Sequence, residues 1–322
     1  MKRIGMAILL TVWSAALAAC GGGNSASSSS SSSAGGAACP AGSGSSGNGA
    51  SVSIGSKGFA EEQLLATMTQ LVLQAHGFNV TYNLQAKDTA IGDALVKGQI
   101  DMLWQYTGTE LTDPGYLNLT NIPTDLNAAF QLVQQKDQAR GLCWTSPAPM
   151  DDTNGLAIKA SDKATLGSTL SDFATYLSSH PNTKICILSE FRTRPDGLPG
   201  LKAKYGAAYG SADYVDVGNT AEKNIANGDC QAGEVFTTDS PIAAQNLYVL
   251  QDDKQLFPPD NVGLVVRQSV LQKYPAIAAL MAPVAAKITS AVITGLNKQV
   301  EIDNMKVTDV ARAWLTQNGF LS

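Results

Sequence analysis

Strand-like and helix-like segments alternate along the chain after its first 50 residues, and this alternation limits the fold more than any other feature of the sequence. Apolar residues alternate over 52–54, recur at helical spacing over 64–72, and alternate again over 80–84. A second amphipathic helix is expected over 88–98 and a third strand over 100–104. Because alternating strands and helices form parallel or mixed sheets covered by helices, the sequence predicts an α/β fold.

Four loops in this pattern carry polar and charged side chains directly after strand-like segments. They are 55–57, 105–109, 189–197 and 237–239. An open α/β sheet binds its ligands in the crevice at the carboxyl ends of its strands, so these loops are expected to line one crevice. The sequence therefore predicts a binding site built from segments that lie far apart in the chain.

The N-terminal segment has the form of a secretory signal peptide. Two basic residues precede an apolar run over 4–19, which is shorter than a stable membrane span. Residues 17–20 are Leu-Ala-Ala-Cys, which resembles the bacterial lipobox, so we expect cleavage before Cys20 and attachment of a diacylglyceryl group to its sulfur. An ordinary signal peptide whose cleavage happens to leave a cysteine is the alternative.

Residues 20–50 consist almost entirely of Gly, Ser, Ala and Asn, which leaves little to bury. A coil of this kind reaches roughly 30 Å. We therefore expect a signal peptide over 1–19, a lipid-anchored tether over 20–50, and a folded body that begins at residue 51. The lipid on Cys20 would hold the body at the extracytoplasmic face of the membrane.

The composition of the chain argues against several classes of function. The net charge of −5 and the absence of Lys/Arg clusters argue against nucleic-acid binding. The two histidines, His76 and His180, have no Cys or His partner at metal-ligand spacing, so no metal site is expected. The sequence contains no phosphate-binding glycine loop and no nucleophile elbow, and we therefore expect neither a cofactor nor an enzymatic activity.

Five motifs together resemble the substrate-binding proteins of osmoprotectant ABC importers, which bind glycine betaine, choline or carnitine. The motifs are Gly-Ser-Lys-Gly-Phe-Ala-Glu-Glu at 55–62, Asp-Met-Leu-Trp-Gln-Tyr-Thr-Gly-Thr at 101–109, Ser-Glu-Phe-Arg-Thr-Arg-Pro-Asp-Gly at 189–197, Phe-Thr-Thr-Asp at 236–239, and the stretch 250–260. The resemblance covers nearly all of residues 52–322. Each motif alone is weak, but their shared order and spacing are specific.

The resemblance implies a type II periplasmic-binding-protein fold, in which two lobes each hold a mixed sheet flanked by helices and a hinge has two crossovers. Lobe 1 would comprise 51–153 and 260–322, and lobe 2 would comprise 154–259. A single continuous domain is the alternative. The implied function is that of an extracytoplasmic solute-binding lipoprotein of an ABC importer. It would be a monomer whose partners are the permease and ATPase subunits.

The resemblance also assigns residues to the two ends of a zwitterionic ligand. Lys57, Thr109 and Arg194 align with donors to the ligand carboxylate, which form charge-assisted hydrogen bonds. Tyr106 and Phe236 align with two members of a four-aromatic cage, whose faces attract a quaternary ammonium.

At the other two cage positions this chain departs from the family, because Asn154 and Asp260 stand where many relatives have tyrosine. We expect a small zwitterion of the glycine betaine type as the ligand. Another small amine or amino-acid derivative is the alternative ligand, and an enzyme on the same fold is the alternative function. Asp260 would either contact the ligand ammonium or face solvent at the hinge. Trp104 shares a strand face with Tyr106, and would either add a wall to the cage or lie in the core.

Four further cysteines would face an oxidising compartment after export. Cys186 and Cys230 lie at the starts of two predicted strands of the same lobe, so we expect them to form a disulfide. The pairing of Cys39 with Cys143 is left open, because Cys39 lies in the expected tether.

Overall fold

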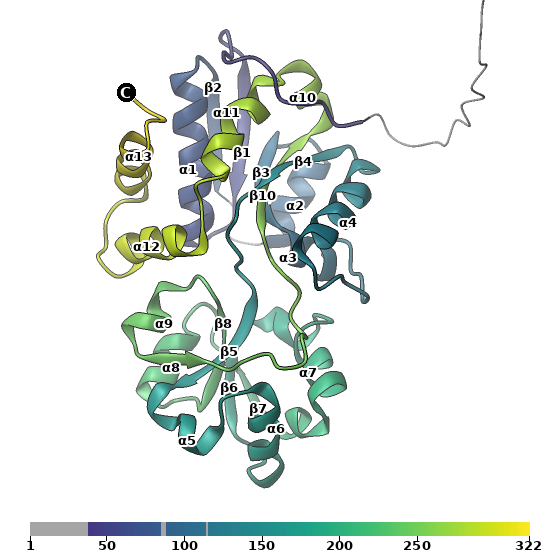
Figure 1. Ribbon diagram of the computed structural model, residues 1–322, viewed down its shortest axis with the longest axis vertical. Helices are drawn as coiled ribbons and strands as arrows, with labels where there is room; N and C mark the ends of the chain where they lie inside the picture. The colour runs from purple at the N-terminus through teal and green to yellow at the C-terminus, as the bar shows by residue number, and fades with distance from the viewer. Residues whose placement is uncertain (1–37, 85–87, 114) are drawn as a thin grey trace, which may run out of the picture. The chain divides into compact units, whose positions relative to one another are not determined.

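The computed structural model describes residues 38–84, 88–113 and 115–322, and the expected signal peptide and Cys20 lie outside these residues. The described chain forms two five-stranded mixed sheets, each flanked by helices (Figure 1). This arrangement confirms the predicted α/β fold class.

The first sheet has the strand order β2-β1-β3-β10-β4. Its strands are β1 (Ser51–Ser56), β2 (Asn79–Leu84), β3 (Met102–Tyr106), β4 (Leu142–Pro147) and β10 (Val262–Arg267). Strand β1 is parallel to β2 and β3, whereas β10 is antiparallel to β3 and β4. The associated helices are α1 (Ala60–Ala75), α2 (Asp88–Val96), α3 (Thr107–Thr112), α4 (Leu126–Gln138), α10 (Gln268–Lys273), α11 (Ala276–Ala285), α12 (Ser290–Glu301) and α13 (Val307–Gln317). We call this part of the molecule lobe 1.

The second sheet has the strand order β7-β6-β8-β5-β9, and we call the part built on it lobe 2. Its strands are β5 (Asn154–Lys159), β6 (Lys184–Ile187), β7 (Asp213–Asp216), β8 (Ala232–Phe236) and β9 (Leu247–Val249). Strand β6 is parallel to β7 and β8, and β5 is antiparallel to β8 and β9. The helices are α5 (Lys163–Leu166), α6 (Leu170–Ser179), α7 (Leu198–Tyr205), α8 (Ala221–Asn227) and α9 (Ser240–Ala244), with 3₁₀ turns at Ala160–Asp162, Ser189–Arg192 and Ala207–Ser211.

Local sequence explains where the helices begin and end. Leu64 and Met68 of α1 are fully buried, as their helical spacing predicts, and Gly77 after the helix has φ of +82°, which glycine adopts without strain. Helix α6 begins with a capping box, in which the Thr169 side chain accepts from the Asp172 N–H and the Asp172 side chain accepts from the Thr169 N–H.

Each lobe has its own hydrophobic core. The core of lobe 1 includes Trp104, whose Nε1 donates to Thr69 Oγ1 at 2.8 Å, and the core of lobe 2 is centred on Phe173, Phe191 and Tyr209. Trp104 is fully buried, so it lies in the core and adds no wall to a ligand cage.

The chain passes twice between the two sheets, from β4 to β5 over 148–153 and from β9 to β10 over 250–261. The two crossovers run side by side in Figure 1, and Asp152 N donates to Asp260 O at 3.1 Å. Paired connections of this kind are typical of proteins whose lobes close around a ligand by a hinge motion.

Residues 38–50 pack against lobe 1, so the expectation of a free tether over this stretch is wrong. Gly47 N donates to His76 O at 2.8 Å. A Cβ atom on Gly47 would lie 2.4 Å from the Phe78 ring, which shows that glycine serves close approach of the backbone here. Composition alone does not distinguish this use of glycine from a flexible linker.

Both remaining cysteine pairs are disulfide-bonded. Cys186 pairs with Cys230, as the sequence predicts, with Cα atoms 5.9 Å apart. Cys39 pairs with Cys143 at a Cα separation of 5.6 Å, and this bond ties the segment 38–50 to β4.

No single helix in the described part of the chain is long and apolar enough to cross a membrane. Helices α11 and α12 meet the criteria of length and composition only as a pair, and they are bent by 89° relative to each other. Across residues 38–84, 88–113 and 115–322, no group of three or more His, Cys, Asp and Glu side chains is arranged to hold a metal ion.

Candidate ligand-binding site

The residues that the sequence analysis assigns to a ligand come from both lobes and from the second crossover. All are buried except Phe236, which is half-buried. In chain order they are Lys57, Tyr106, Thr109, Asn154, Arg194, Phe236 and Asp260.

Lys57, directly after β1, lies against the ring of Tyr106 at the end of β3. Its Nζ is 4.9 Å from the ring centroid and donates to Gln105 Oε1 at 2.7 Å. The parallel pairing of β1 with β3 brings the two loops together. The ammonium therefore lies beside a π face and a neutral amide, and its charge also lowers the pKa values of the buried carboxyls of Glu61 and Asp260.

Asp260 in the second crossover is 3% exposed, so the alternative that it faces solvent at the hinge is wrong. Its Oδ1 accepts from the backbone N of Gly108 at 2.5 Å and of Thr109 at 3.1 Å, and its Oδ2 accepts from Thr109 Oγ1 at 3.0 Å. Asp260 thus fixes the first turn of α3, where the backbone N–H groups of a helix have no partner within the helix.

The charges of both lobes act on Asp260. Burial raises the pKa of this carboxyl to about 7, while Arg194, the hydrogen bonds from Thr109 and the charge of Lys57 each lower it. Lys57 belongs to lobe 1 and Arg194 to lobe 2, so charges of both lobes influence Asp260, while Thr109 contacts it directly.

Arg194 follows β6 and joins the two lobes. Its Nε and Nη2 donate to the Asp196 carboxylate at 3.0 and 2.9 Å, and Nη2 also donates to Thr112 Oγ1 of α3 at 3.4 Å. The Asn154 amide is oriented so that its oxygen accepts from Arg194 Nη2 at 3.0 Å and its nitrogen donates to Glu234 Oε1 at 3.1 Å. Asn154 therefore orients the guanidinium group from inside lobe 2.

Arg194 and Glu234 have perturbed acid–base equilibria. Burial by itself would lower the pKa of Arg194, but the neighbouring Asp196 carboxylate raises it above the ordinary value. Burial raises the pKa of Glu234 to about 8, although the Leu188 backbone N–H donates to it at 2.8 Å and Arg194 lies nearby. At neutral pH Arg194 is charged and Glu234 is mostly protonated.

Phe236 ends β8 and pairs in register with Asn154 across the sheet of lobe 2. Its backbone N donates to Asp239 Oδ2 at 2.7 Å. The sequence analysis missed a further aromatic residue, Phe59, whose ring centroid is 6.3 Å from that of Tyr106. The available signal was its place in the first motif, two residues after Lys57.

Glu61 of α1 is a buried carboxylate that the sequence analysis did not assign to the site. Tyr106 Oη donates to its Oε1 at 2.5 Å, and Thr238 Oγ1 and Asn297 Nδ2 donate to its Oε2 at 2.7 and 2.8 Å. Thr238 follows β8 of lobe 2, so Glu61 links a candidate cage residue to the opposite lobe. A glutamate in the first turn of a helix is already favourable there because of the helix dipole, so position 61 alone gives no signal of this second role.

Thr238 also links Glu61 to a second buried carboxyl. Its Oγ1 lies 2.6 Å from Asp152 Oδ1. A hydroxyl has one hydrogen, so Thr238 Oγ1 donates to only one of the two carboxyls at a time. Burial raises the pKa of both carboxyls, and the charge of Glu61 adds to the rise at Asp152.

Two mixed sheets joined by paired crossovers, with charged residues of both lobes meeting between them, define the class of type II periplasmic binding proteins. Residues 50–317 match the family described as the substrate binding domain of ABC-type glycine betaine transport systems. The chain belongs to this family.

The relatives have names that indicate related ligands. The glycine-betaine-binding protein of Pseudomonas aeruginosa is 32% identical over 279 residues, which are 83% of this chain and 88% of that protein. The glycine betaine-binding protein YehZ of Escherichia coli is 28% identical over 285 residues, 84% of this chain and 91% of YehZ. The structure of apo YehZ has a TM-score of 0.62 at 26% identity, covering 84% of this chain and 99% of the YehZ chain. The ergothioneine transport permease/ergothioneine binding protein EgtU of Helicobacter pylori is 27% identical over 270 residues, 83% of this chain and 47% of that protein.

Members of this family are extracytoplasmic substrate-binding proteins of ABC importers. Family membership therefore implies a small-molecule ligand and a permease as partners, and a role in transport rather than in catalysis.

Proposed function

We propose that this protein is a lipid-anchored receptor that binds a small zwitterion of the glycine betaine type between its lobes and delivers it to an ABC permease. The observation that supports this most directly is the pair of buried cations, Lys57 of lobe 1 and Arg194 of lobe 2, whose charges both lower the pKa of Asp260. A ligand carboxylate is attracted by these two charges, whereas a purely cationic ligand such as choline is repelled by them.

In this proposal the two ends of the ligand have different partners. Lys57, Thr109 and Arg194 donate to the ligand carboxylate, which strengthens each hydrogen bond by charge. Tyr106 and Phe236 offer π faces to the ligand ammonium. The ligand lies between groups of both lobes, so binding favours the closed arrangement.

Asn154 and Asp260 make the remainder of the site polar. A carboxylate at position 260 attracts any ammonium by its charge. It also accepts hydrogen bonds from an ammonium that carries N–H groups, whereas a fully methylated ammonium has no N–H to donate. The proposed ligands therefore include glycine betaine and also zwitterions whose ammonium carries fewer methyl groups. Both kinds belong in the set of ligands to be tested.

The proposal also includes the lipid anchor. Cys20 carries the lipid, and the Gly/Ser-rich stretch up to residue 37 tethers the body. Because residues 38–50 pack against lobe 1, the proposed tether ends at residue 37 instead of residue 50.

Calorimetric titration of the mature protein with glycine betaine, carnitine, proline, ergothioneine and choline tests the proposed function. We expect carboxylate-bearing zwitterions to bind and choline to bind weakly or not at all. Lys57→Met should weaken every carboxylate-bearing ligand by about 1–3 kcal/mol, because one charged donor is lost. The matched control is Lys97→Met, which changes an exposed lysine beyond α2. Tight choline binding without binding of any zwitterion contradicts the proposal.

A further inference from the structure

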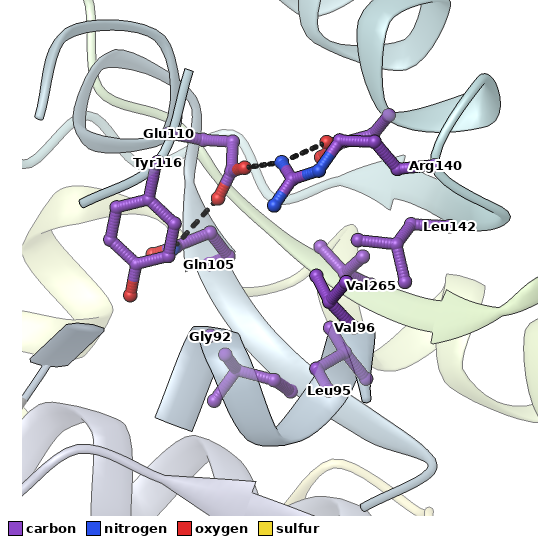
Figure 2. Close-up of a pocket in the computed structure, with 11 residues that line it drawn as sticks. Gly92, Leu95, Val96, Gln105, Glu110, Tyr116, Arg140, Leu142 and Val265 are labelled. Carbon is purple, nitrogen blue, oxygen red and sulfur yellow. Dashed lines mark hydrogen bonds and ion pairs between the residues drawn. The ribbon is translucent and has the colours of Figure 1, made fainter. Parts of the chain in front are cut away.

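Gln105 of β3 is 1% exposed and lies between Lys57 and a buried cluster of charged residues. Figure 2 shows the side of Gln105 that faces Glu110 and Arg140. Lys57 Nζ donates to Gln105 Oε1 at 2.7 Å, and Gln105 Nε2 donates to Glu110 Oε2 of α3 at 3.0 Å. The other oxygen of Glu110 pairs with Arg140 Nη1 at 2.5 Å, and this nitrogen also pairs with Asp137 Oδ1 at 2.7 Å. A continuous series of hydrogen bonds thus runs from α4 to the candidate site.

The partners of Gln105 determine which end of its amide faces which residue. An ammonium only donates and an ionised carboxylate only accepts, so the amide oxygen faces Lys57 and the amide nitrogen faces Glu110. The Tyr106 backbone N–H also donates to the amide oxygen, at 3.0 Å. Arg140 favours the ionised, accepting form of Glu110. The ionised Glu110 therefore holds the nitrogen end of an amide whose oxygen end is held by Lys57 and the Tyr106 N–H.

We propose that Glu110 is a positioning residue that, through the amide of Gln105, sets where the ammonium of Lys57 lies for an anionic group of the ligand. This positioning role rests on the proposed function in one respect, namely that the ligand has an anionic group for Lys57 to contact. Glu110 itself does not contact the ligand.

The proposal has a pH dependence of defined sign. Burial raises the pKa of Glu110 to about 7; the charge of Asp137 adds to this rise and Arg140 opposes it. The small cavity that Glu110 lines is also lined by Tyr116, Asp137 and Arg140, and Lys57 lies beyond Gln105. Below this pKa the protonated carboxyl can donate a hydrogen bond, so it no longer requires the Gln105 amide nitrogen to face it. Affinity for an anionic group should therefore fall as the pH falls through about 7.

The test compares the full mature protein with Glu110→Gln and Asp137→Asn. The first measurement is the side-chain ¹⁵N signal of the Lys57 ammonium in ligand-free protein. The second is the Kd for glycine betaine across the pH range 5.5–8.5. Asp260 and Glu234 titrate in a similar range, so the informative quantity is the difference between the variants.

Glu110→Gln should shift the Lys57 signal, weaken glycine betaine roughly tenfold at pH 8, and remove the component of the pH dependence that Glu110 contributes. Asp137→Asn keeps the hydrogen bond between Glu110 and Gln105, so its Kd at pH 8 should stay within about twofold of the wild type. Because Asp137 raises the pKa of Glu110, its removal should move the midpoint of the pH dependence to lower pH. A purely structural role of the cluster predicts no such midpoint shift and similar losses in both variants.

Two outcomes overturn the positioning role: an unchanged Lys57 signal in Glu110→Gln, or equal losses of affinity in both variants without a midpoint shift. If Glu110→Gln does not fold, Gln105→Met removes the same connection and should also shift the Lys57 signal; an unshifted signal in that variant overturns the role as well. If Glu110→Gln shifts the Lys57 signal but the wild-type protein does not bind glycine betaine, the shift supports the positioning role and the lack of binding contradicts the proposed function.

Discussion

Replacing Asp260 with asparagine should change how the stability of this protein depends on pH. The asparagine oxygen still accepts from the backbone N of Gly108 and Thr109, and its nitrogen can donate to the Thr109 hydroxyl, which rotates to accept. The substitution keeps the shape of the side chain and removes its ability to carry a charge, so it isolates the electrostatic contribution.

The size of the effect follows from the pKa. Burial raises the pKa of Asp260 from 3.8 to about 7. A carboxyl whose pKa is raised by folding contributes stability that is complete below its unfolded pKa and is lost as the pH rises through the folded pKa. A rise of about 3 units corresponds to about 4 kcal/mol, of which about 3 kcal/mol is lost between pH 5 and pH 8. The wild type should therefore lose about 3 kcal/mol relative to Asp260→Asn over this range.

Urea unfolding of the two proteins at several pH values measures this difference directly. Other buried carboxyls titrate in both proteins, so their contributions largely cancel. Asp93→Asn, at an exposed position on α2, is the matched control for the loss of a carboxylate. The reasoning is refuted if the free energies of unfolding of wild type and Asp260→Asn differ by the same amount at every pH. It is also refuted if the wild type gains stability relative to the variant as the pH rises to 8.

Three further predictions concern the lobe contact, the N-terminal segment and the anchor. Thr238→Val removes the hydroxyl shared by two buried carboxyls of the site and should weaken ligand binding by about 1–3 kcal/mol; unchanged affinity in calorimetry would show that the lobe contact is not coupled to binding. Replacing Cys39 and Cys143 with alanine opens a loop with a sequence separation of 104 residues and should cost about 5 kcal/mol in urea unfolding. A loss below about 1 kcal/mol would contradict a stabilising role for this disulfide. Intact-mass analysis of membrane-extracted protein should show an acyl mass on Cys20, and an unmodified cysteine in a chain that keeps its signal peptide would contradict lipidation.

Local sequence determined the element types and the loops that carry the candidate site. Helical spacing of apolar residues predicted α1, and alternation predicted β1 and β2 close to their observed bounds. The third strand forms at Met102–Tyr106, two residues later than predicted, which places Tyr106 at its end. These features depend on neighbours within a few residues, and a single sequence contains that information. The family motifs then selected Lys57 and Arg194, two buried cations whose charges both lower the pKa of Asp260, and their role in ligand binding stays a prediction.

The tertiary structure decided which of these groups are buried and what they contact. Asp260 caps α3 across about 150 positions of the chain, and Glu61 meets Thr238 only because the two lobes touch. The packing of residues 38–50 on lobe 1 likewise depends on a ring, Phe78, that no local pattern connects to them. Burial and hydrogen-bond partners control the pKa of a carboxyl, and both are set by segments distant in sequence, so the charge state of this site could be known only from the fold.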